Sequence, residues 1–345
     1  MLKRGISETI VACRSCGSSS LEVFLDLGVS ALADRLVNPD DLGAEEIKAP
    51  LRVAFCKTCG LVQIDETVEP EILFYSEYPY YSSVSPALVE HSRKNVEQLI
   101  RRRGLTGDSL VMEIASNDGY LLQHYTASGV PVLGIDPAPG PAAAAEKVGV
   151  PTMNAFFTDT LAEELRREGR MADVVHANNV LAHVADTNGF VAGIRTILKD
   201  QGVAVIEAPY VRELIDHVEF DTIYHQHLCY FSVTALDKLF RRHQLFLNDL
   251  DLLDIHGGSL RLYVEPVENV GRRVSEQLAL EAEIGLDRLE YYTQFSSRVA
   301  TLRSNLTSTL AELKRDGARI AGYGAAAKAA TLINYAEIGP DMLDF

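Results

Sequence analysis

The chain has 345 residues, of which 47% are hydrophobic and 23% are charged, and its formal net charge is −16. This composition is typical of a globular protein with two or three domains, and the acidic balance argues against binding to nucleic acid, which needs a basic surface to displace counterions. The sequence offers no run of about 18 apolar residues for a membrane span and no secretory signal at its start, so we expect a cytoplasmic protein without membrane or nucleic-acid partners.

Residues 1–70 carry two matched pairs of cysteines and are expected to form a zinc-binding domain. Each pair has the form Cys-x-x-Cys-Gly, in "CRSCG" and "CKTCG", and the glycine lets the chain turn back under a metal. In a reducing compartment such pairs are more often metal ligands than disulfides. Four thiolates fill a tetrahedral shell, which predicts a structural rather than a catalytic zinc ion. The predicted ligands are Cys13, Cys16, Cys56 and Cys59, and the alternative is two independent surface turns.

A tyrosine-rich segment, "FYSEYPYYSSVSP", follows the zinc-binding domain and leads into a predicted helical region that ends near residue 105. Its tyrosines form a rigid aromatic surface with hydroxyl tips. One interpretation is packing between two domains, and the other is a wall of a ligand pocket. Under the second interpretation we name Tyr78 and Tyr80 as candidates for contact with a substrate.

Residues 71–268 are predicted to form a second domain with a Rossmann-like fold. Apolar runs at 109–115, 131–136, 172–179, 202–209 and 260–266 alternate with helical stretches. Strands that are apolar on both faces and separated by helices predict an α/β domain with a mostly parallel sheet covered on both sides.

The stretch "LVMEIASNDGYLLQ" predicts a strand, a turn of small residues and a helix, where a cofactor approaches the backbone. Asp136 ends the next strand and can accept hydrogen bonds from both hydroxyls of a ribose. A pyrophosphate would be repelled by Glu113 and Asp118, whereas a sulfonium and an amino group would not. We therefore favour S-adenosylmethionine (SAM) over a dinucleotide. The predicted cofactor-binding residues are Glu113, Ala115, Asn117, Asp118, Gly119, Asp136, Asn178 and Asn179.

The C-terminal part, residues 269–345, is predicted to begin with a long amphipathic helical segment. The stretch "ARIAGYGAAAKAATLINY" then predicts a strand, a glycine turn and a helix. A lone unit of this kind cannot bury both faces of its strand, so we expect a truncated Rossmann-like unit or one completed by a partner.

Two glycine turns are candidate contacts for the substrate. The turn in "IHGGSLRLY" is either a simple tight turn or a contact to a ligand such as a diphosphate. The turn in "GYGAAAKA" offers backbone N–H groups, a helix N-terminus and a lysine, which together can hold a phosphate. The residues named here are His256, Gly257, Arg261, Tyr323 and Lys328.

A series of motifs in one order resembles a known family. The motifs are the two cysteine pairs, "EIASNDGYLL", "GIDPA", "NNVLAHVAD", "YHQHLCYFS", "HGGSLRLY" and "GYGAAAKA". The chain resembles the SAM-dependent sugar C-methyltransferases that act on nucleotide-linked keto-deoxysugars. This resemblance covers the whole chain and implies a zinc-binding domain, a Rossmann-like SAM domain and a second Rossmann-like domain, with a nucleotide-sugar substrate. It does not identify the sugar, the methylated carbon, the nucleotide or the oligomeric state, and a monomer is one of the possible states.

The resemblance assigns roles within "DTIYHQHLCYFS". It implies that His227 is the base, assisted by Tyr224 and by His183 of "NNVLAHV"; from the residues alone, His183 is equally well a capping or surface histidine. The family usually has glutamate between the two histidines, where this chain has Gln226. A glutamine can bind a sugar hydroxyl but cannot take a proton. We expect Gln226→Glu to maintain or raise activity on sugars typical of the family.

The chemistry of carbon methylation supports these assignments. A carbon next to a ketone becomes a nucleophile when a base removes its proton and donors stabilise the enolate oxygen. A neutral histidine with a pKa near 6.5 is a suitable base. We expect His225 to have a structural or gating role and Cys229 to be a small buried residue, because the ligands for a second metal site are missing.

Other functions stay open at this point. An O- or N-methyltransferase would need a base but no enolate stabilisation. A zinc-containing enzyme that modifies RNA is disfavoured by the acidic charge. An inactive homologue is suggested by Gln226 and by the short C-terminal unit.

Overall fold

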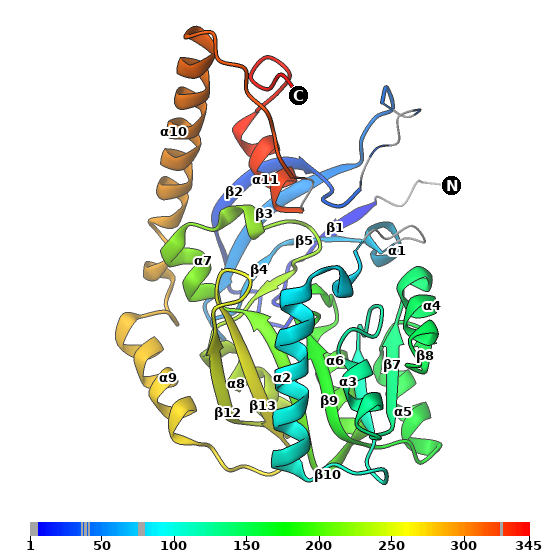
Figure 1. The fold of residues 1–345 in the computed structure, drawn as a ribbon. Coiled ribbons are helices and arrows are strands. Elements are labelled where there is room, and N and C mark those ends of the chain that lie inside the picture. The colour runs from blue at the N-terminus through cyan, green and yellow to red at the C-terminus, as the bar shows by residue number, and fades with distance from the viewer. Residues whose placement is uncertain (1–5, 36, 38–39, 41, 75–79, 325–326) are drawn as a thin grey trace, which may run out of the picture.

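The computed structural model describes residues 6–35, 37, 40, 42–74, 80–324 and 327–345 (Figure 1). The strands are β1 (Ser7–Thr9), β2 (Leu21–Ala31), β3 (Lys48–Cys56), β4 (Val62–Ile64), β5 (Glu66–Val68), β6 (Val111–Ile114), β7 (Val132–Asp136), β8 (Thr152–Asn154), β9 (Ala172–Asn178), β10 (Leu198–Pro209), β11 (Cys229–Tyr230), β12 (Phe246–Leu253) and β13 (Ser259–Glu265). The helices are α1 (Pro70–Leu73), α2 (Pro86–Arg103), α3 (Leu122–Ala127), α4 (Pro139–Lys147), α5 (Asp159–Arg167), α6 (Thr187–Ile197), α7 (Val211–His217), α8 (Val233–Arg242), α9 (Arg272–Ile284), α10 (Phe295–Arg315) and α11 (Ala327–Ala336). Short 3₁₀ turns are η2 (Ser82–Val84), η3 (Leu181–His183), η4 (Phe220–Thr222) and η5 (Leu289–Tyr291). Within these ranges, no helix is both long and apolar enough to cross a membrane.

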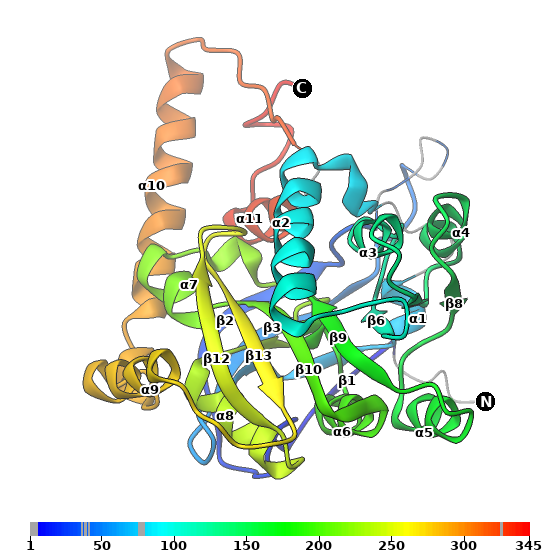
Figure 2. The same cartoon turned by 60° about the horizontal axis from the view of Figure 1, so that its bottom comes forward.

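A seven-stranded sheet with the order β12-β13-β10-β9-β6-β7-β8 forms the centre of the molecule. Strands β10, β9, β6, β7 and β8 run parallel, and β13 and β12 are added antiparallel at one edge. Figure 2 shows α2 and α3 on one face of this sheet and α5, α6 and α8 on the other. The predicted α/β, Rossmann-like sheet is confirmed, and its carboxyl edge is where ligands bind in open sheets of this kind.

Helix α2 begins and ends where its sequence specifies. Ser85 is the N-cap and accepts a hydrogen bond from the backbone N–H of Leu88, Pro86 takes the first helical position, and Gly104 ends the helix with φ 60°. Its apolar side packs against strands β6, β9 and β10 together with Tyr125 of α3. The helix therefore covers the sheet and fixes the segment at 80–85 that precedes it.

The zinc-binding module has a sheet of its own, with the order β11-β4-β3-β2. Strand β11 lies outside residues 1–70 in the sequence and pairs with β4 through Cys229 and Gln63. The backbone N–H of Ile64 also donates to the carbonyl of Leu228 at 3.0 Å. A segment of the Rossmann-like domain thus completes the sheet of the zinc-binding module.

The C-terminal segment differs from the sequence-based expectation. Residues 318–324 form a loop, so the strand predicted there is absent from this described segment. A strand needs a neighbour to satisfy its backbone groups, and no strand of the described chain runs beside these residues. Helix α11 does form, as expected. It packs against η4 and β2, and the hydroxyl of Thr331 donates to the carbonyl of Ile223 at 2.7 Å.

Candidate active site and zinc centre

The four predicted cysteine ligands come together. Their Sγ atoms lie within 4.8 Å of one another, with Cys13 3.6 Å from Cys59 and Cys16 3.5 Å from Cys56. A tetrahedral zinc with Zn–S bonds of about 2.3 Å needs sulfur atoms about 3.8 Å apart, so the cluster fits this metal. Both knuckle turns close as predicted: Gly17 and Gly60 have positive φ and donate to the carbonyls of Cys13 and Cys56.

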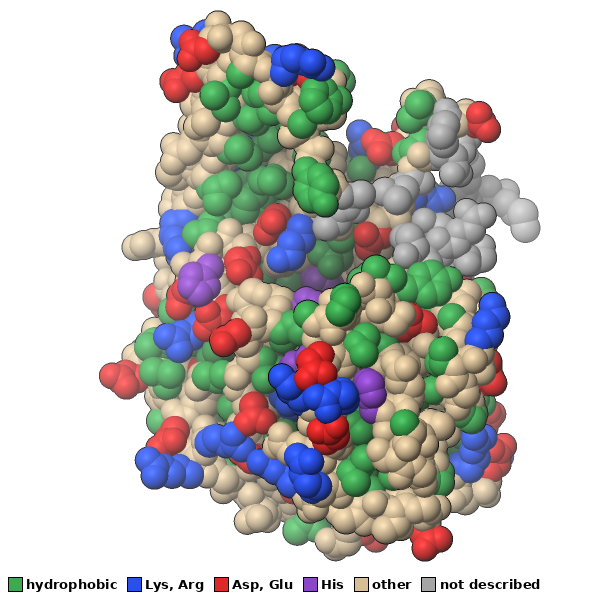
Figure 3. Space-filling view, viewed as in Figure 1, with side chains coloured by type: hydrophobic (Ala, Val, Ile, Leu, Met, Phe, Trp, Pro, Cys, Tyr) green, Lys and Arg blue, Asp and Glu red, His purple; other side chains and the backbone are tan. Residues whose placement is uncertain are grey.

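A cavity of about 1050 Å³ opens at the carboxyl edge of the large sheet. Its walls come from β6, β7 and β9, from the segment 219–230, from the zinc-binding module and from α11. Figure 3 shows histidine side chains in the hollow between the part that carries α10 and α11 and the sheet below. The predicted site residues that line this cavity are Tyr80, Ala115, Asn117, Asp136, Asn178, Asn179, His183, Tyr224, Gln226, His227, His256 and Lys328.

His227 and Tyr224 form a hydrogen-bonded pair in the cavity wall. Nδ1 of His227 lies 2.8 Å from the carbonyl oxygen of Thr222, so this nitrogen carries the proton and donates it to the carbonyl. Nε2 lies 2.8 Å from the hydroxyl of Tyr224 and accepts its hydrogen bond. The backbone therefore fixes the tautomer that leaves a basic lone pair on Nε2, facing the phenol.

A second histidine approaches this pair from η3. The ring centroids of His183 and His227 are 4.8 Å apart and the rings meet edge to face. Burial lowers the pKa of His183 to about 4, opposed by backbone groups of Gln226 and Asn179. Burial and the neighbouring His183 lower the pKa of His227 well below its ordinary value. Both imidazoles are therefore neutral at pH 7, as a base and a hydrogen-bond donor require.

The two neighbours of His227 in the motif differ in role. His225 lies away from the cavity, with Nε2 3.2 Å and 3.1 Å from the carbonyl oxygens of Ala49 and Pro50 in β3, which agrees with the structural alternative. Gln226 lines the cavity and is 3% exposed. His225 thus attaches this loop to the zinc-binding module, and Gln226 faces the cavity.

The other end of the cavity carries groups that suit a nucleoside. The carboxylate of Asp136 accepts hydrogen bonds from the backbone N–H groups of Asn117 and Ala138, at 2.8 Å and 2.9 Å, and still lines the cavity. Oδ1 of Asn178 is buried without a hydrogen-bond partner in the described chain. Asn179 has φ 53° and Ala115 has φ 57°, which turn the backbone at the ends of β9 and β6. These acceptors and backbone turns fit the ribose and amino acid parts of SAM.

Three of the predicted cofactor residues do not line the cavity. Glu113 is buried inside β6, where burial and then the charges of Asp136 and Asp118 raise its pKa well above the ordinary value. A neutral Glu113 repels no phosphate, so the charge argument for SAM loses this residue. Asp118 instead accepts from the backbone N–H of Ser83. Gly119 packs on Val150 and Ala145, where a Cβ would lie 3.1 Å from Val150 Cγ2.

Asn117 lines the cavity and also binds the segment that precedes α2. It lines the cavity, but its side chain accepts from the backbone N–H of Ser82 at 2.9 Å and donates to the carbonyl of Tyr80 at 3.1 Å. Together with Asp118 it fastens the segment at 80–83 over the cofactor end of the cavity. The sequence reasoning placed both side chains against the cofactor itself.

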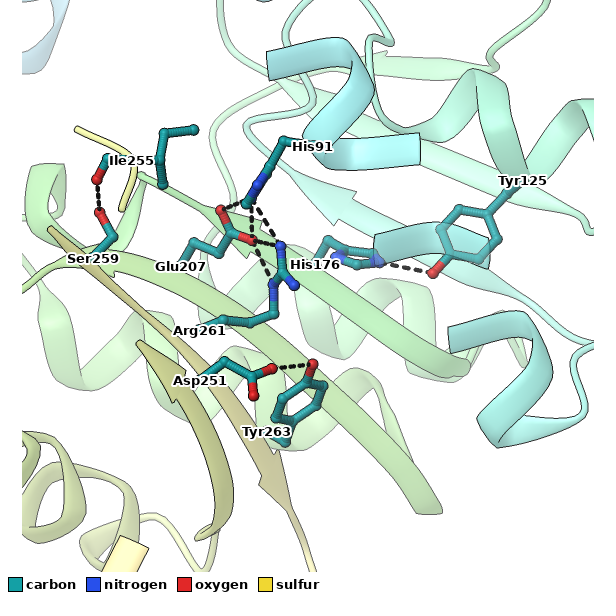
Figure 4. A network of polar contacts seen from close by, with 9 residues as sticks. All are labelled: His91, Tyr125, His176, Glu207, Asp251, Ile255, Ser259, Arg261 and Tyr263. Atoms are coloured by element: carbon teal, nitrogen blue, oxygen red, sulfur yellow. Dashed lines mark hydrogen bonds and ion pairs between the residues drawn. The ribbon is translucent and has the colours of Figure 1, made fainter. Parts of the chain in front are cut away.

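Three of the predicted substrate residues also lie away from the cavity. Arg261 is 7% exposed and pairs with Glu207 across strands β13 and β10, with Nε 2.7 Å from Oε1 (Figure 4). Nε2 of His91 from α2 completes this cluster, 3.0 Å from both Glu207 oxygens. Burial acts to raise the pKa of Glu207, but His91 and Arg261 lower it below its ordinary value. The cluster holds α2 on the sheet.

The turn requires glycine at position 257. The φ of Gly257 is 81°, and a Cβ there would lie 2.2 Å from the carboxylate of Glu219. Gly258, the next residue, does line the cavity. Tyr323 is fully exposed on the loop at 318–324 and lies away from the cavity that Lys328 enters. Tyr78 lies outside the described residues.

Several cavity residues were missed from the sequence. The hydroxyl of Tyr230 is buried without a hydrogen-bond partner in the described chain, and Phe74 contacts His183 edge to face with ring centroids 6.1 Å apart. Asp34 reaches the cavity from the loop after β2. The motif itself contained Tyr230, but nothing in the sequence brought Asp34 of the zinc-binding module to the second domain.

Comparison with known proteins assigns each part of the chain. Residues 13–74 match a family described as a zinc binding domain, residues 88–247 a methyltransferase domain, and residues 254–345 a C-methyltransferase C-terminal domain. The chain is 33% identical to the C-methyltransferase NovU of Streptomyces niveus over 343 residues, which are 99% of this chain and 81% of NovU. It is 28% identical to a ubiquinone biosynthesis O-methyltransferase of Azorhizobium caulinodans over 127 residues, 36% of this chain and 47% of that protein.

Solved structures show weaker likeness. A SAM-dependent methyltransferase of Clostridium acetobutylicum has a TM-score of 0.43 and 11% identity, covering 53% of this chain and 92% of that one. Magnesium protoporphyrin IX methyltransferase of Synechocystis PCC 6803 has a TM-score of 0.42 and 15% identity, covering 51% and 82%.

Proposed function

The chain belongs to the C-methyltransferase family, and from this membership we propose that it methylates a nucleotide-linked ketodeoxysugar at the carbon next to the ketone. Its methyl donor is SAM, and its Cys₄ cluster holds a structural zinc ion. One observation supports the proposal above the others. A neutral imidazole–phenol pair and the Asp136–Asn178 end share one cavity.

We assign proton removal to His227. Its Nδ1–H is held by the carbonyl of Thr222, so the imidazole can take a proton only on Nε2. Because the ring is buried and neutral at pH 7, the lone pair is available without prior deprotonation. The imidazolium that forms after proton transfer then stands beside the phenol of Tyr224.

The phenol stabilises the charge that develops on the ketone oxygen. In the free enzyme the hydroxyl of Tyr224 donates to Nε2 of His227. When a ketone binds and Nε2 takes the carbon-bound proton, the hydroxyl turns to donate to the enolate oxygen. The imidazolium N–H can then donate to the phenol oxygen, so the two side chains share the charge. His183 is the second donor, since its ring lies in contact with that of His227.

The cofactor supplies an electrophilic methyl group when it is bound. Asp136 would accept hydrogen bonds from the ribose hydroxyls, and Oδ1 of Asn178 would offer an acceptor to the amino acid or base. Lys328 of α11 also lines the cavity and can hold a phosphate of the nucleotide.

Proton exchange tests this function most directly. The protein is incubated in heavy water with nucleotide-linked 3- and 4-ketosugars, without SAM, and deuterium at the carbon next to the ketone is measured. We expect exchange with at least one sugar, and methylation of the same carbon once SAM is added. Exchange with none of the sugars, or a methyl group found on oxygen, contradicts the proposal.

A further inference from the structure

Glu219 presents a carboxyl group to the cavity that the proposed mechanism does not use. It follows α7 and lines the cavity wall. Among the described residues, none donates a hydrogen bond to its side chain or forms an ion pair with it. The residue is half-buried, and neither of its carboxylate oxygens is among the buried polar atoms without a partner, so both oxygens are open to solvent. Glu219 therefore offers two free acceptor atoms to a ligand.

A strained turn of the backbone places Glu219 in the cavity wall. Val218, the residue before it, has a φ of 58°, in the left-handed region that β-branched residues avoid. Such a conformation persists only where the surrounding structure enforces it, and it is found most often at functional sites. Here the side chain of Val218 packs against the main hydrophobic core, and the backbone N–H of Glu219 donates to the carbonyl of Leu214 at 2.9 Å. The end of α7 is thus fixed in the direction that leads Glu219 to the cavity.

The glycine turn between β12 and β13 makes room for this carboxylate. Figures 1 and 2 both show α7 beside the turn. A Cβ at Gly257 would lie 2.2 Å from one carboxylate oxygen of Glu219 and 2.6 Å from the other. A Cβ at Gly258 would lie 2.5 Å from Cγ of Glu213 in α7. The two glycines therefore match the turn to the two glutamates, and only the second glutamate, Glu219, lines the cavity.

Glu219 and the proposed base belong to one hydrogen-bonded unit. The carbonyl of Glu219 accepts from the backbone N–H of Thr222 at 3.1 Å and from its hydroxyl at 2.8 Å. The carbonyl of Thr222 in turn accepts from Nδ1 of His227. The backbone that carries the carboxylate is therefore tied to the imidazole, which suits a group that orients a substrate toward that imidazole.

From these contacts we propose that Glu219 accepts a hydrogen bond from a ring hydroxyl group of the ketosugar and is a specificity-determining residue of the enzyme. The inference rests on the proposed function. A carboxylate only accepts, so it selects a group that donates, and it repels the phosphates of the nucleotide. A hydrogen bond to a charged acceptor is stronger than one between neutral groups. The bound hydroxyl thus orients the ring, so that the carbon next to the ketone meets Nε2 of His227.

The test compares nucleoside-diphosphate ketosugars with their analogues that lack one ring hydroxyl group. Methyl transfer by the full zinc-loaded chain is followed by mass spectrometry, and kcat/KM is measured for both sugars of a pair with the same protein preparation. Their ratio does not depend on the fraction of folded protein. We expect the wild type to prefer the hydroxylated sugar by about 10–100-fold at one ring position. A wild type without such a preference at any position contradicts the inference.

Three variants locate the preference. Glu219→Ala removes the acceptor and should reduce the ratio to within about threefold of unity, by lowering kcat/KM for the hydroxylated sugar. Glu219→Gln keeps a neutral acceptor of the same size and should give an intermediate ratio. Glu213→Gln is the matched control, because Glu213 lies against the neighbouring glycine of the same turn but away from the cavity. This control should keep the wild-type ratio.

The outcomes separate the inference from the proposed function. If Glu219→Ala keeps the wild-type ratio, the inference is wrong and the proposed function stands. If Glu219→Ala does not fold, Glu219→Gln decides, and an undiminished ratio overturns the inference. A variant without turnover is compared through the Kd of the two sugars, measured by calorimetry, with the same expected ratios. If the wild type neither exchanges protons with any ketosugar nor methylates one, the proposed function fails and the inference fails with it.

Discussion

The hydroxyl of Tyr224 lies 2.8 Å from Nε2 of His227, on the opposite side of the ring from the carbonyl of Thr222 that holds Nδ1 at 2.8 Å. One turn of the chain thus contains the proposed base, the group that fixes its tautomer and the group that occupies its lone pair. The phenol occupies this nitrogen, so under the proposed mechanism a bound ketone has to displace it.

His227→Asn tests the base. The amide can keep the hydrogen bond to Thr222 but cannot take a proton, so kcat should fall by about 10²–10⁴-fold. Affinity for SAM, measured by calorimetry, should stay within about twofold because the residue lies at the other end of the cavity. Normal turnover with this variant would remove His227 as the base. Weak SAM binding would instead mean that the substitution disturbs the cavity as a whole.

The fall of kcat/KM at acidic pH, the acidic limb of its profile, gives an independent test of His227. Burial and His183 lower the pKa of His227 below 6.5, so the neutral form persists as the pH falls below that value. We expect kcat/KM to stay level from pH 8 to below pH 6.5 and to fall only at more acidic values. Tyr224→Phe removes the phenol and should lower kcat by about 100-fold while the limb remains. A limb at or above pH 6.5 contradicts the assignment.

Stability should also depend on pH, through a histidine outside the site. His176 in β9 is fully buried, accepts or donates one hydrogen bond to the hydroxyl of Tyr125 at 2.9 Å, and burial lowers its pKa to about 3 (Figure 4). The unfolded chain binds a proton there below pH 6.5 and the folded protein does not, so the contribution of His176 to stability is lost as the pH falls. Between pH 7 and pH 5 this amounts to about 2 kcal/mol.

Denaturant unfolding at these two pH values checks the effect. The variant His176→Gln should show a smaller loss of stability between pH 7 and pH 5 than the wild type, whatever its absolute stability. The exposed His217 provides the matched control, as His217→Gln. Equal losses in wild type and His176→Gln would contradict the role of His176.

Gln226→Glu now has the opposite expected outcome from the one that the sequence alone suggested. Burial raises the pKa of Asp34, and the side chain of Gln226 opposes this effect through a hydrogen bond, so the two side chains are neighbours. The new carboxyl group would lie against Asp34, and one of the two would stay protonated or turn away from the cavity. We expect kcat/KM to fall about tenfold, and to fall further as the pH rises and both groups ionise. The double variant Asp34→Asn with Gln226→Glu exchanges the two groups and should recover activity. Higher activity of Gln226→Glu alone would show that the carboxyl groups do not meet.

Removal of zinc should destabilise the segment Leu228–Tyr230, which follows His227. Nε2 of Gln63 donates to Sγ of the zinc ligand Cys13 at 3.2 Å, and Gln63 pairs with Cys229 in β11. Amide hydrogen exchange of Leu228–Tyr230 should therefore become at least about tenfold faster in the apo protein, and thermal stability should fall. Amides of β7 in the large sheet serve as the control and should change little. Unchanged exchange at β11 would mean that zinc stabilises its own module alone.

The sequence predicted the parts of this molecule that short-range patterns determine. Alternating strands and helices predicted the sheet, the Cys-x-x-Cys-Gly turns predicted the zinc cluster, and the motif around His227 predicted the pair with Tyr224. Contacts between distant segments did not follow from these patterns. Asp34 enters the site from a loop that lies almost two hundred residues before Gln226 in the sequence. No short-range pattern in the sequence predicts that these two side chains are neighbours.

The wrong site predictions have a common cause. The chemistry of each side chain was inferred correctly, but the neighbouring groups that bind it in the fold were not predicted. Asp118 has a suitable chemistry for a cofactor, but the backbone of Ser83 takes its oxygens. Arg261 could hold a phosphate, but Glu207 lies opposite it in the next strand and neutralises it. The strand predicted at the start of "ARIAGYGAAAKAATLINY" has the right composition, but no strand of the described residues pairs with it. A sequence shows which groups are available, and the fold decides which of them remain free.

Strand β11 comes from the second domain but belongs to the sheet of the zinc-binding module, which limits how such enzymes can be recombined. A chimaera that grafts the first 70 residues of one relative onto the remainder of another would pair a foreign β4 with the resident β11, two residues from His227, to which we assign proton removal. Successful grafts should carry both strands, and Asp34 with its glutamine, as one inherited set. Differences in substrate preference among natural homologues should accordingly follow paired changes in the zinc-binding module and in the segment 219–230, rather than changes in the large sheet.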